Sequence, residues 1–571
     1  MTNLLTGLEA RRGTTKNRLL YGDNLTVMQG MNSASVDLIY LDPPFNSQRT
    51  YNLIYRQLTG APLPEQEEAF CDAWAMDEEK EQMARNMPVV LKQHDVPESL
   101  IVFWKAWIDA LRNSQPRLLA YLIYMSYRLL EMRRILKPTG SLFLHCDPAA
   151  SHYIKVILDS LFGHENFRNE IIWKRTSAHS SARRCGPVHD TIFFYTKSDR
   201  YTWNNLYQKY DDGYIETFYN HVDPDGRRWR RSDLTGAGTR NGETGKPWRG
   251  VDVTSKGRHW AWPPSVLDEM DAEGKIHWPK KVGGIPMLKR YLDEQPGMPL
   301  QDIWTDIPPI HALSPERLGY QTQKPLPLLE RIIAMASNEG DVVFDPFCGC
   351  GTTIYAAQKA KRRWIGCDIA ILSIRIVREV LHARYGVLEG HHYEVSGVPL
   401  TVEGAQDLFG RDPRQFEHWV VELAGGFPSN KASNDRGIDG SIWFETGGQY
   451  RRTILSVKGG KLRPDFMREL RGTLARESDN GNADMGGLIC LQEPTAGMRR
   501  EAAEAGMFTY KGIEYPRLQI RTVAELLDGR GFQTPSRVKT LGWEMQPSLA
   551  LEAAAPTKAR RRFTKGIAAA I

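Results

Sequence analysis

Cysteine is scarce in this chain, which has seven cysteines among 571 residues and no Cys-x-x-Cys pair. The sequence therefore indicates neither a zinc site nor a disulfide framework, and a reducing, cytoplasmic compartment is expected. Long apolar runs are also missing, because the most apolar helix candidate, residues 118–130, is interrupted by Arg128 and is too short to span a bilayer. No apolar segment follows the first charges of the N-terminus, so the sequence predicts neither a secretory signal nor a membrane partner.

The net charge of +6 is unevenly spread, because residues 227–290 hold 14 Lys and Arg against 7 Asp and Glu. A local excess of this kind favours a surface for a polyanion, most simply nucleic acid. Tryptophans lie among the basic residues, and phosphate contact with aromatic support is typical of a DNA-binding surface. The alternative is that these tryptophans form the core of a small domain. The candidate DNA-binding residues are Arg230, Arg231, Arg249 and Arg258.

An acid–Pro–Pro–aromatic run, Asp42-Pro43-Pro44-Phe45, directly follows the apolar segment 36–41, which is typical of a buried strand. Proline has a fixed φ and no N–H, so the carbonyls here can be held in a set direction with the Asp42 carboxylate beside them. Such acceptors can hydrogen-bond the amino group of a nucleobase while the Phe45 ring stacks on the base. The alternative is an Asx-Pro turn at the end of a strand.

A second motif, residues 342–353, predicts a strand, a glycine-rich turn and a helix. The glycines let the backbone approach a ligand closely, and the start of the helix offers free N–H groups to an anion. Asp368 ends another strand about 20 residues further on, where a doubly wound fold places a carboxylate on ribose hydroxyls. A nicotinamide site is the alternative, but the third glycine of Gly-x-Gly-x-x-Gly is absent. The candidate cofactor-binding residues are Asp345, Phe347, Gly349, Gly351, Thr352 and Asp368.

The first motif resembles the catalytic motif of amino-DNA methyltransferases, which methylate N6 of adenine or N4 of cytosine. The second is similar to the S-adenosylmethionine loop of that family, Asp-Pro-Phe-x-Gly-x-Gly-Thr-Thr. Lys324, in Gln-Lys-Pro, matches the segment that closes over the methionine end of the cofactor, and Asp23 matches the acid that meets its adenine amino group. The resemblance covers about residues 15–390. With the catalytic motif first, the order resembles the β-group and the modification subunits of type III restriction systems.

The resemblance implies a site-specific DNA methyltransferase that uses S-adenosylmethionine and acts on double-stranded DNA in a restriction–modification or phage-defence setting. It makes Asp42, Pro43, Pro44 and Phe45 catalytic and adds Asp23 and Lys324 to the cofactor-binding residues. An Asp in the first position favours N6 of adenine, with N4 of cytosine as the alternative. A homodimer, or a separate restriction or helicase subunit, is a further expected assembly. A non-catalytic DNA-binding protein on the same scaffold is the competing interpretation, which the intact motifs disfavour.

Residues 405–530 contain a third pattern: Glu417 on an amphipathic helix, Asp439 after a glycine, and Lys458 at the end of a strand. The pattern resembles the PD-(D/E)xK nuclease fold, especially Mrr-like restriction endonucleases. The resemblance implies that Asp439, with Glu417 and Lys458, binds Mg²⁺ and carries cleavage. Ser456 stands where the family has an acid or Gln, and a hydroxyl is a weak metal ligand. The domain is therefore either an active endonuclease or a nuclease-derived module that only binds DNA or a partner.

Together these observations predict an α/β chain: a Rossmann-like S-adenosylmethionine-dependent methyltransferase with an irregular inserted recognition domain, followed by a smaller α/β restriction-endonuclease-like domain. Residues 55–100 lack a strong hydrophobic period and are expected to be a loop near the site. The expected parts are a catalytic part at 1–199, the basic insert at 200–315, a cofactor-binding part at 316–395, the endonuclease-like domain at 405–530, and a basic, disordered tail at 541–571.

Overall fold

The computed structural model of the chain describes residues 16–44, 50–53, 67–71, 74–148, 150–177, 185–281, 283–311, 314–318, 320, 322–429, 437–446, 449–479 and 483–535. They belong to two compact units, one of residues 203–302 and one of the residues on either side of that segment. Phe45 and the expected tail 541–571 lie outside the described residues.

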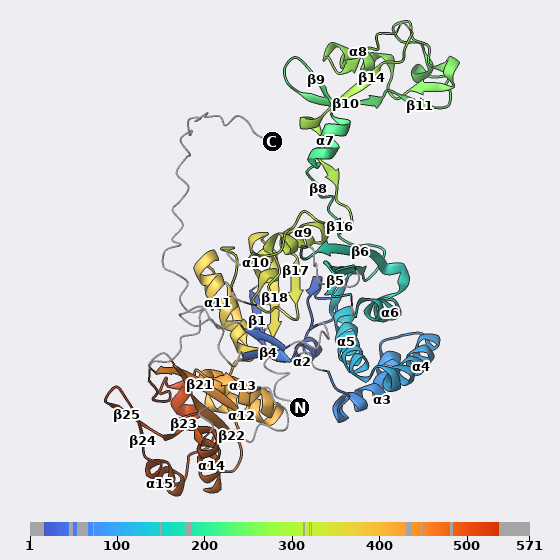
Figure 1. Cartoon of the computed structure of the whole chain (residues 1–571). Helices are drawn as coiled ribbons and strands as arrows, with labels where there is room; N and C mark the ends of the chain where they lie inside the picture. Colours follow the sequence, from blue (N-terminus) through green and yellow to red (C-terminus); the bar gives the residue numbers. More distant parts are fainter. Residues whose placement is uncertain are drawn as a thin grey trace, which may run out of the picture. The chain divides into compact units, whose positions relative to one another are not determined.

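A nine-stranded sheet forms the centre of the larger unit, with the strand order β16-β6-β7-β5-β2-β17-β18-β1-β19 (Figure 1). Every strand is parallel to its neighbours except β7, which is antiparallel to β5 and β6. The α/β fold expected from the sequence is confirmed, with this one antiparallel strand. The strands are β1 (Asn17–Tyr21), β2 (Val36–Leu41), β5 (Leu136–Cys146), β6 (Phe167–Lys174), β7 (His189–Thr196), β16 (Ile303–Trp304), β17 (Val342–Asp345), β18 (Arg363–Asp368) and β19 (Tyr393–Ser396).

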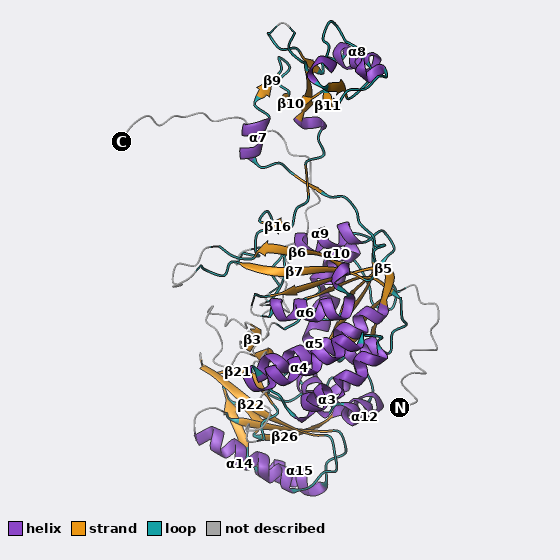
Figure 2. Cartoon of the chain, turned by 90° about the vertical axis from the view of Figure 1, so that its right-hand side faces the viewer, coloured by secondary structure: helices purple, strands orange, loops and turns teal. Residues whose placement is uncertain are grey.

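Helices cover both faces of this sheet, as parallel strands require, because such strands are apolar on both sides (Figures 1 and 2). The central strand β17 is buried along its whole length. On one face lie α2 (Asn24–Gln29), α5 (Pro116–Ile135) and α6 (Ser151–Phe162), and on the other lie α9 (Leu326–Ala336), α10 (Thr352–Lys359) and α11 (Ile371–Tyr385).

The segment 55–100, expected to be a loop, instead contains a long helix, α3 (Glu78–Gln93), and the start of α4 (Glu98–Ser114). Its polar composition hid a narrow apolar face, on which Ala84, Met87 and Leu91 are buried against the main core. Asp77 caps α3 by accepting a hydrogen bond from Lys80 N at 2.9 Å. A short hairpin, β3 (Thr50–Leu53) with β4 (Glu67–Cys71), precedes it.

The sheet brings together strands that are far apart in the sequence. β17 pairs in parallel with β2 on one side, with Phe344 beside Ile39, and with β18 on the other. β18 in turn pairs with β1, with Asp368 beside Tyr21. Because the carboxyl ends of parallel strands meet at one edge, the segments that follow β1, β2, β17 and β18 converge there.

Residues 203–302 fold as a unit of their own around a core that includes Leu234, Trp248, Val253, Trp260 and Leu267. This favours the interpretation of Trp248 and Trp260 as core residues. The insert is shorter than the expected 200–315, because β16 already pairs with β6 of the large sheet. Its elements are β8 (Tyr207–Gln208), α7 (Asp212–Phe218), β9 (His221–Val222), β10 (Arg228–Asp233), β11 (Thr235–Ala237), β12 (Arg258–Trp260), α8 (Pro264–Ala272), β13 (Ile276–His277), β14 (Met287–Tyr291) and β15 (Met298–Pro299).

The C-terminal part of the larger unit is built on a five-stranded sheet in the order β20-β21-β22-β23-β26, with α14 and α15 packed along it (Figure 2). Its strands are β20 (Phe427–Pro428), β21 (Gly440–Thr446), β22 (Gln449–Lys458), β23 (Met485–Cys490) and β26 (Leu518–Thr522), with the hairpin β24 (Met507–Tyr510) and β25 (Ile513–Pro516). Its helices are α12 (Val402–Arg411), α13 (Pro413–Leu423), α14 (Asp465–Asp479), α15 (Ala496–Glu504) and α16 (Val523–Leu527).

Candidate functional site

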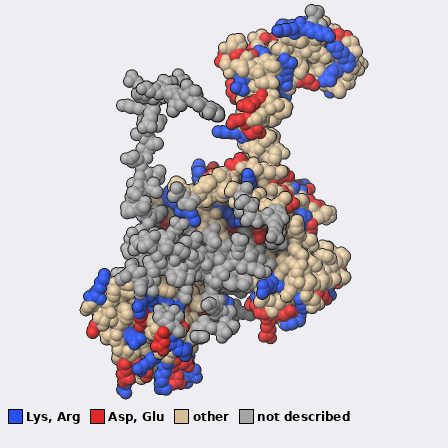
Figure 3. All heavy atoms as spheres, in the orientation of Figure 1, with Lys and Arg blue, Asp and Glu red and all other residues tan. Residues whose placement is uncertain are grey.

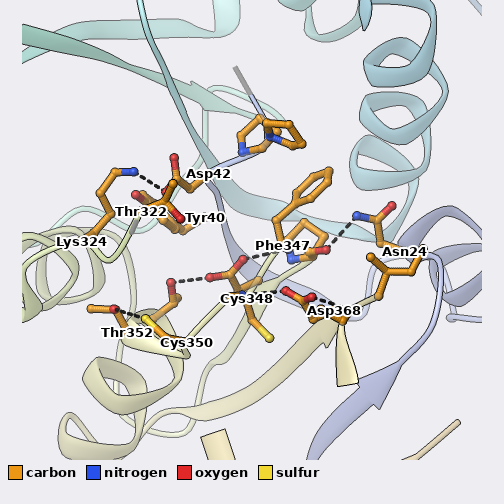
Figure 4. A pocket seen from close by; sticks show the side chains of 18 of the residues that line it. Asn24, Tyr40, Asp42, Thr322, Lys324, Phe347, Cys348, Cys350, Thr352 and Asp368 are labelled. Carbon is orange, nitrogen blue, oxygen red and sulfur yellow. Dashed lines mark hydrogen bonds and ion pairs between the residues drawn. The ribbon is translucent and has the colours of Figure 1, made fainter. Parts of the chain in front are cut away.

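A pocket lies at the carboxyl edge of the nine-stranded sheet, where β1, β2, β17 and β18 end (Figure 4). Both sequence motifs contribute to its wall, and the fold therefore brings the two motifs into one site. The predicted residues that line it are Asp23, Asp42, Pro43, Pro44, Lys324, Asp345, Phe347, Gly349, Thr352 and Asp368. Phe45, the predicted stacking residue, lies outside the described residues.

The Asp42 carboxylate has two different environments at its two oxygens. Oδ2 accepts a hydrogen bond from Nζ of Lys324, which lies in the segment before α9 and beside Asp42 at the wall of the pocket (Figure 4). Oδ1 is buried and has no hydrogen-bond partner among the described residues. A buried acceptor without a partner is costly, so its presence in a pocket indicates a donor that arrives with a ligand.

Asp345 ends β17 and is fully buried beneath the same pocket. Its Oδ1 accepts from Phe347 N at 3.0 Å, and its Oδ2 accepts from Thr353 Oγ1 at 2.5 Å. Burial raises the pKa of this carboxyl to about 7; the two hydrogen bonds lower it, and the charges of Asp42 and Asp368 raise it slightly further. Burial therefore favours the protonated form of Asp345 in the free site, and a cationic ligand would favour the ionised form.

The glycine-rich turn is held by Asp368 at the end of β18. Asp368 Oδ2 accepts from Gly349 N at 2.8 Å, and its Oδ1 accepts from Ala370 N at 2.9 Å. Gly349 has a positive φ and lines the pocket. Gly351 also has a positive φ but is not among the lining residues, because the space of its missing side chain is filled by Val377 and Tyr355 beneath the turn.

Asp23 caps the N-terminus of α2, where its Oδ1 accepts from Leu25 N at 3.0 Å and from Thr26 N at 3.1 Å. Its Oδ2 accepts from Arg128, a buried arginine of α5 whose Nε also donates to Asn24 Oδ1 at 2.6 Å. Asn24 donates in turn to the Pro346 carbonyl at 2.8 Å. Arg128 and Asn24 therefore position two walls of the pocket, and neither was among the site residues predicted from the sequence. Only the presence of a charge in an apolar helix hinted at Arg128.

The predicted DNA-binding arginines of the insert differ in their surroundings. Arg249 pairs with Asp268 and Asp271, and Arg258 pairs with Asp233. Arg230 lies over the Tyr219 ring, 5.7 Å from its centroid, whereas Arg231 on β10 is exposed and has no partner among the described residues. Lys and Arg side chains gather over part of the insert surface (Figure 3). The structure thus leaves Arg231 most available to an external anion among the four.

In the C-terminal domain, the Asp439 carboxylate accepts hydrogen bonds from neighbouring groups of the protein itself. Its Oδ2 accepts from Val457 N at 2.6 Å and from Ser456 Oγ at 3.2 Å. Lys458 Nζ lies over the Phe466 ring, 5.2 Å from its centroid, and Glu417 lies on α13. No cluster of three or more His, Cys, Asp or Glu suited to a metal ion occurs in the described ranges. Within the part of the chain that the structure describes, Asp439 therefore lies beside Ser456 and belongs to no such cluster.

None of the described helices is both long enough and apolar enough to cross a bilayer.

Two family models match the chain: one described as DNA methylase matches residues 36–379, and one described as NACHT-associated inactive Restriction Endonuclease 1 matches residues 413–528. Type II methyltransferase M.EcaI of Enterobacter cloacae is 34% identical over 45% of this chain and 56% of that protein. The StyLTI Mod subunit, from a type III restriction-modification enzyme of Salmonella typhimurium, is 26% identical over 63% of this chain and 53% of that protein. DNA adenine methyltransferase YhdJ of Escherichia coli is 22% identical over 64% of this chain and 82% of that protein.

The chain spans slightly more than half the length of the first two relatives. The DNA methylase model, in contrast, covers more than half of this chain, and its match includes the two motifs that meet at the pocket. The chain belongs to the DNA methylase family.

Proposed function

We propose that this chain transfers the methyl group of S-adenosylmethionine to the exocyclic amine of a DNA base that has left the duplex. The observation that carries the proposal is the buried, unpartnered Oδ1 of Asp42 beside a pocket lined by the cofactor motif. An exocyclic amine is the donor that this acceptor lacks.

The residues of the pocket fit S-adenosylmethionine. A buried carboxylate, Asp345, and a half-buried one, Asp368, suit its cationic groups and its hydroxyls, and the Phe347 ring offers an apolar wall. At Gly349 a Cβ would stand 3.2 Å from Tyr320 Cε1, so a side chain there would require the Tyr320 ring to shift by a few tenths of an ångström. When bound, the cofactor supplies a methyl group on a sulfonium that is already strongly electrophilic.

The chain's own part in the reaction is alignment and hydrogen bonding. The lone pair of the target amine is delocalised into the base, which makes it a poor nucleophile. Asp42 Oδ1 and the Pro43 carbonyl accept from the amine's N–H bonds and localise the lone pair as attack begins. Lys324 holds the other Asp42 oxygen and so fixes the direction of Oδ1. Extruding the base costs a few kcal/mol, which stacking by Phe45 would partly offset.

The favoured target is N6 of adenine, with N4 of cytosine as the alternative. Asp in the first position of the motif supports adenine, as does the similarity to a relative named as a DNA adenine methyltransferase. The β-group assignment is supported by the order of the motifs and by similarity to a type III Mod subunit. That similarity also supports a separate restriction or helicase subunit as a partner, with a homodimer as the other expected assembly.

The insert, residues 203–302, is proposed to be the target-recognition domain on double-stranded DNA. Its support is its separate fold and the basic side chains on its surface (Figure 3). Replacing it with the insert of a relative of different specificity should change the methylated sequence, and an unchanged sequence would refute this role.

The C-terminal domain is proposed to bind DNA or a partner without cutting. The match to an inactive restriction endonuclease family supports this, as does Asp439, whose carboxylate bonds Ser456 and Val457. The bifunctional alternative requires Mg²⁺-dependent cleavage that is lost in Asp439→Ala. Incubating the full chain with plasmid DNA and Mg²⁺ separates the two, since intact plasmid is the expected result.

The decisive experiment measures transfer of radiolabelled methyl groups to DNA, followed by sequencing of the product. Asp42→Ala should abolish methyl transfer while S-adenosylmethionine binding largely survives. Asp37→Ala is the control, because Asp37 also pairs with a lysine, Lys137, at 2.8 Å, but lies near the start of β2, whereas Asp42 directly follows the end of that strand. Retained activity in Asp42→Ala would remove Asp42 from the mechanism.

A further inference from the structure

One sheet of the insert, with the strand order β13-β14-β10-β9, carries a cluster of basic and aromatic side chains on one face (Figure 1). His221 on β9 lies directly opposite Trp229 on β10, so the two side chains share a face. Arg231 follows two residues after Trp229 on the same strand and therefore belongs to that face as well. The ring of His277, on the edge strand β13, lies 5.2 Å from the Trp229 ring, measured between centroids.

The buried Trp229 ring supports this cluster. Its exposure is 4%, and its Nε1 donates to Asp223 Oδ1 at 2.7 Å. The His221 ring stacks on the indole with centroids 4.4 Å apart, and the two imidazoles lie 6.3 Å apart with an interplanar angle of 18°. His221 and His277 are half-buried, and neither imidazole has a hydrogen-bond partner among the described residues. Their ring nitrogens are therefore available to an external ligand.

The charges around the two imidazoles decide which kind of ligand they suit. Burial, followed by the charge of Arg231, lowers the pKa of both His221 and His277. A charge on His221 and the charge of Lys289 lower the pKa of His277 further. Asp223 acts on His277 in the opposite direction. Neutral imidazoles can bind metal ions, but the cationic groups beside them repel a cation, so the cluster suits an anion.

The acidic groups of this face are already paired. Asp223 Oδ2 accepts from Lys289 Nζ at 2.7 Å and from the Tyr291 hydroxyl at 2.5 Å. Asp233, the next residue of β10 on the same face, pairs with an arginine of β12 at 3.2 Å. Arg231 has no such partner in the described ranges, so its charge is not compensated beside the two imidazoles. The face therefore carries positive charge together with two groups that can each gain another.

Resting on the proposed role of the insert as the target-recognition domain, we propose that His221, His277 and Arg231 form a phosphate-binding subsite for the DNA backbone. The Arg231 guanidinium donates to the phosphodiester oxygens, and each imidazole donates from a ring nitrogen once it is protonated. The subsite holds the duplex rather than reading its bases, because phosphate contacts position a protein on DNA and carry no sequence information directly.

The subsite makes DNA affinity depend on pH. In the free protein the lowered pKa of each imidazole keeps it neutral at about pH 7. A bound phosphodiester favours the charged form and so raises the pKa in the complex, where the imidazoles take up protons. Binding is therefore tighter at low pH, and this advantage is lost as pH rises through the pKa of the complex. Contacts made by arginine and lysine alone do not vary in this range, because both stay charged.

The double variant His221→Gln/His277→Gln tests the subsite in the full chain, because glutamine keeps a hydrogen-bond donor but cannot gain a charge. Fluorescence anisotropy with labelled duplex DNA, at constant ionic strength, measures affinity from about pH 8 to about pH 5.5. The wild type should bind more tightly as pH falls, whereas the double variant should not. At the acid end the variant should bind about tenfold more weakly, the smaller end of what a hydrogen bond to a charged group contributes.

His259→Gln is the matched control, because His259 lies on β12 of the same insert and its Nδ1 is 2.8 Å from the Gly238 carbonyl oxygen. It should keep the pH dependence of the wild type. Arg231→Ala, at an exposed position, should weaken binding at every pH, since the guanidinium is charged throughout.

Two results would overturn the subsite alone: a wild type whose DNA affinity does not change with pH, or a double variant that keeps the wild-type pH dependence. Loss of that dependence in His259→Gln would have the same consequence. An insert exchange that leaves the methylated sequence unchanged would overturn the recognition role, and the subsite with it.

Discussion

Lys324 Nζ pairs with Asp42 Oδ2, although 282 residues separate them in the sequence. By resemblance Lys324 belongs to the cofactor segment, but in the structure its charged group reaches the residue proposed to bind the base. The contact joins the two functional motifs through one ion pair at the wall of the pocket (Figure 4).

Lys324→Ala should therefore resemble an Asp42 variant rather than a cofactor-site variant. A hydrogen bond to a charged group contributes about 1.5–3 kcal/mol, which corresponds to a fall of about 10- to 100-fold in the single-turnover methylation rate. The affinity for S-adenosylmethionine, measured by calorimetry, should change little. Lys137→Ala, which breaks the pair with Asp37, is the control and should leave the rate intact. A selective loss of cofactor affinity would instead assign Lys324 to the cofactor.

Asp345 should make cofactor binding depend on pH. Its pKa of about 7 lies well above that of an ordinary aspartate, because it is buried. A cationic ligand favours the ionised form, so affinity for S-adenosylmethionine should rise with pH up to about 7 and then level off, with proton release on binding below that pH. Calorimetry in buffers of different ionisation enthalpy measures that release. Asp345→Asn should bind with an affinity that no longer varies across this range.

The same carboxyl also predicts how the free protein responds to pH. A raised pKa in the folded state means that the folded protein binds a proton more tightly than the unfolded chain. Its contribution to stability is present at low pH and is lost as pH rises from the ordinary aspartate range through about 7. Thermal melts should show that added S-adenosylmethionine stabilises more at pH above this value than below it. Equal stabilisation on both sides would contradict the assignment of Asp345 to the cofactor.

Gly351→Ala should damage the cofactor turn by packing rather than by blocking the ligand. Its φ is +89°, and a Cβ there would stand 2.7 Å from Val377 Cγ2 and 2.9 Å from Tyr355 Cζ. The left-handed conformation costs about 1–2 kcal/mol for a non-glycine residue, and overpacking adds about 1–3 kcal/mol. Gly340→Ala is the control, because Gly340 has a φ of +85° with nothing within 4 Å of a Cβ. Chemical denaturation should show the larger loss in Gly351→Ala; equal losses would mean that Val377 and Tyr355 adjust freely.

Arg231→Ala should weaken DNA binding more than Arg227→Ala. Arg231 is exposed and has no ion-pair partner in the described part of the chain, whereas Arg227 already pairs with Asp293 and Glu294. Replacing a phosphate-contacting residue should lower affinity for all sequences and reduce the slope of log K against log salt by about one. Fluorescence anisotropy across a salt series measures both quantities. An unchanged slope in Arg231→Ala would place the DNA surface elsewhere.

Local sequence was sufficient to predict structure where all the residues of a motif are neighbours in the chain. The run from Val342 to Thr353 predicted strand, turn and helix, because apolar residues, glycines and helix formers follow one another there. It was insufficient for residues 78–93, whose polar composition hid a helix that is stable only because one narrow face meets the main core. The same holds for Asp439, because its bonds to Ser456 and Val457 depend on how β22 passes beside it.

The sequence by itself determined the two motifs, the α/β class and the family-like order of the parts, because each depends on residues that are neighbours in the chain. Only the tertiary structure decided which distant residues share a site. It placed β17 between β2 and β18, and so brought Asp345 and Lys324 to Asp42. It also aligned Tyr40, His145 and Asp190 across three strands. Such pairings depend on strand order, which is set by burying the apolar faces of the whole sheet and is not encoded by any single segment.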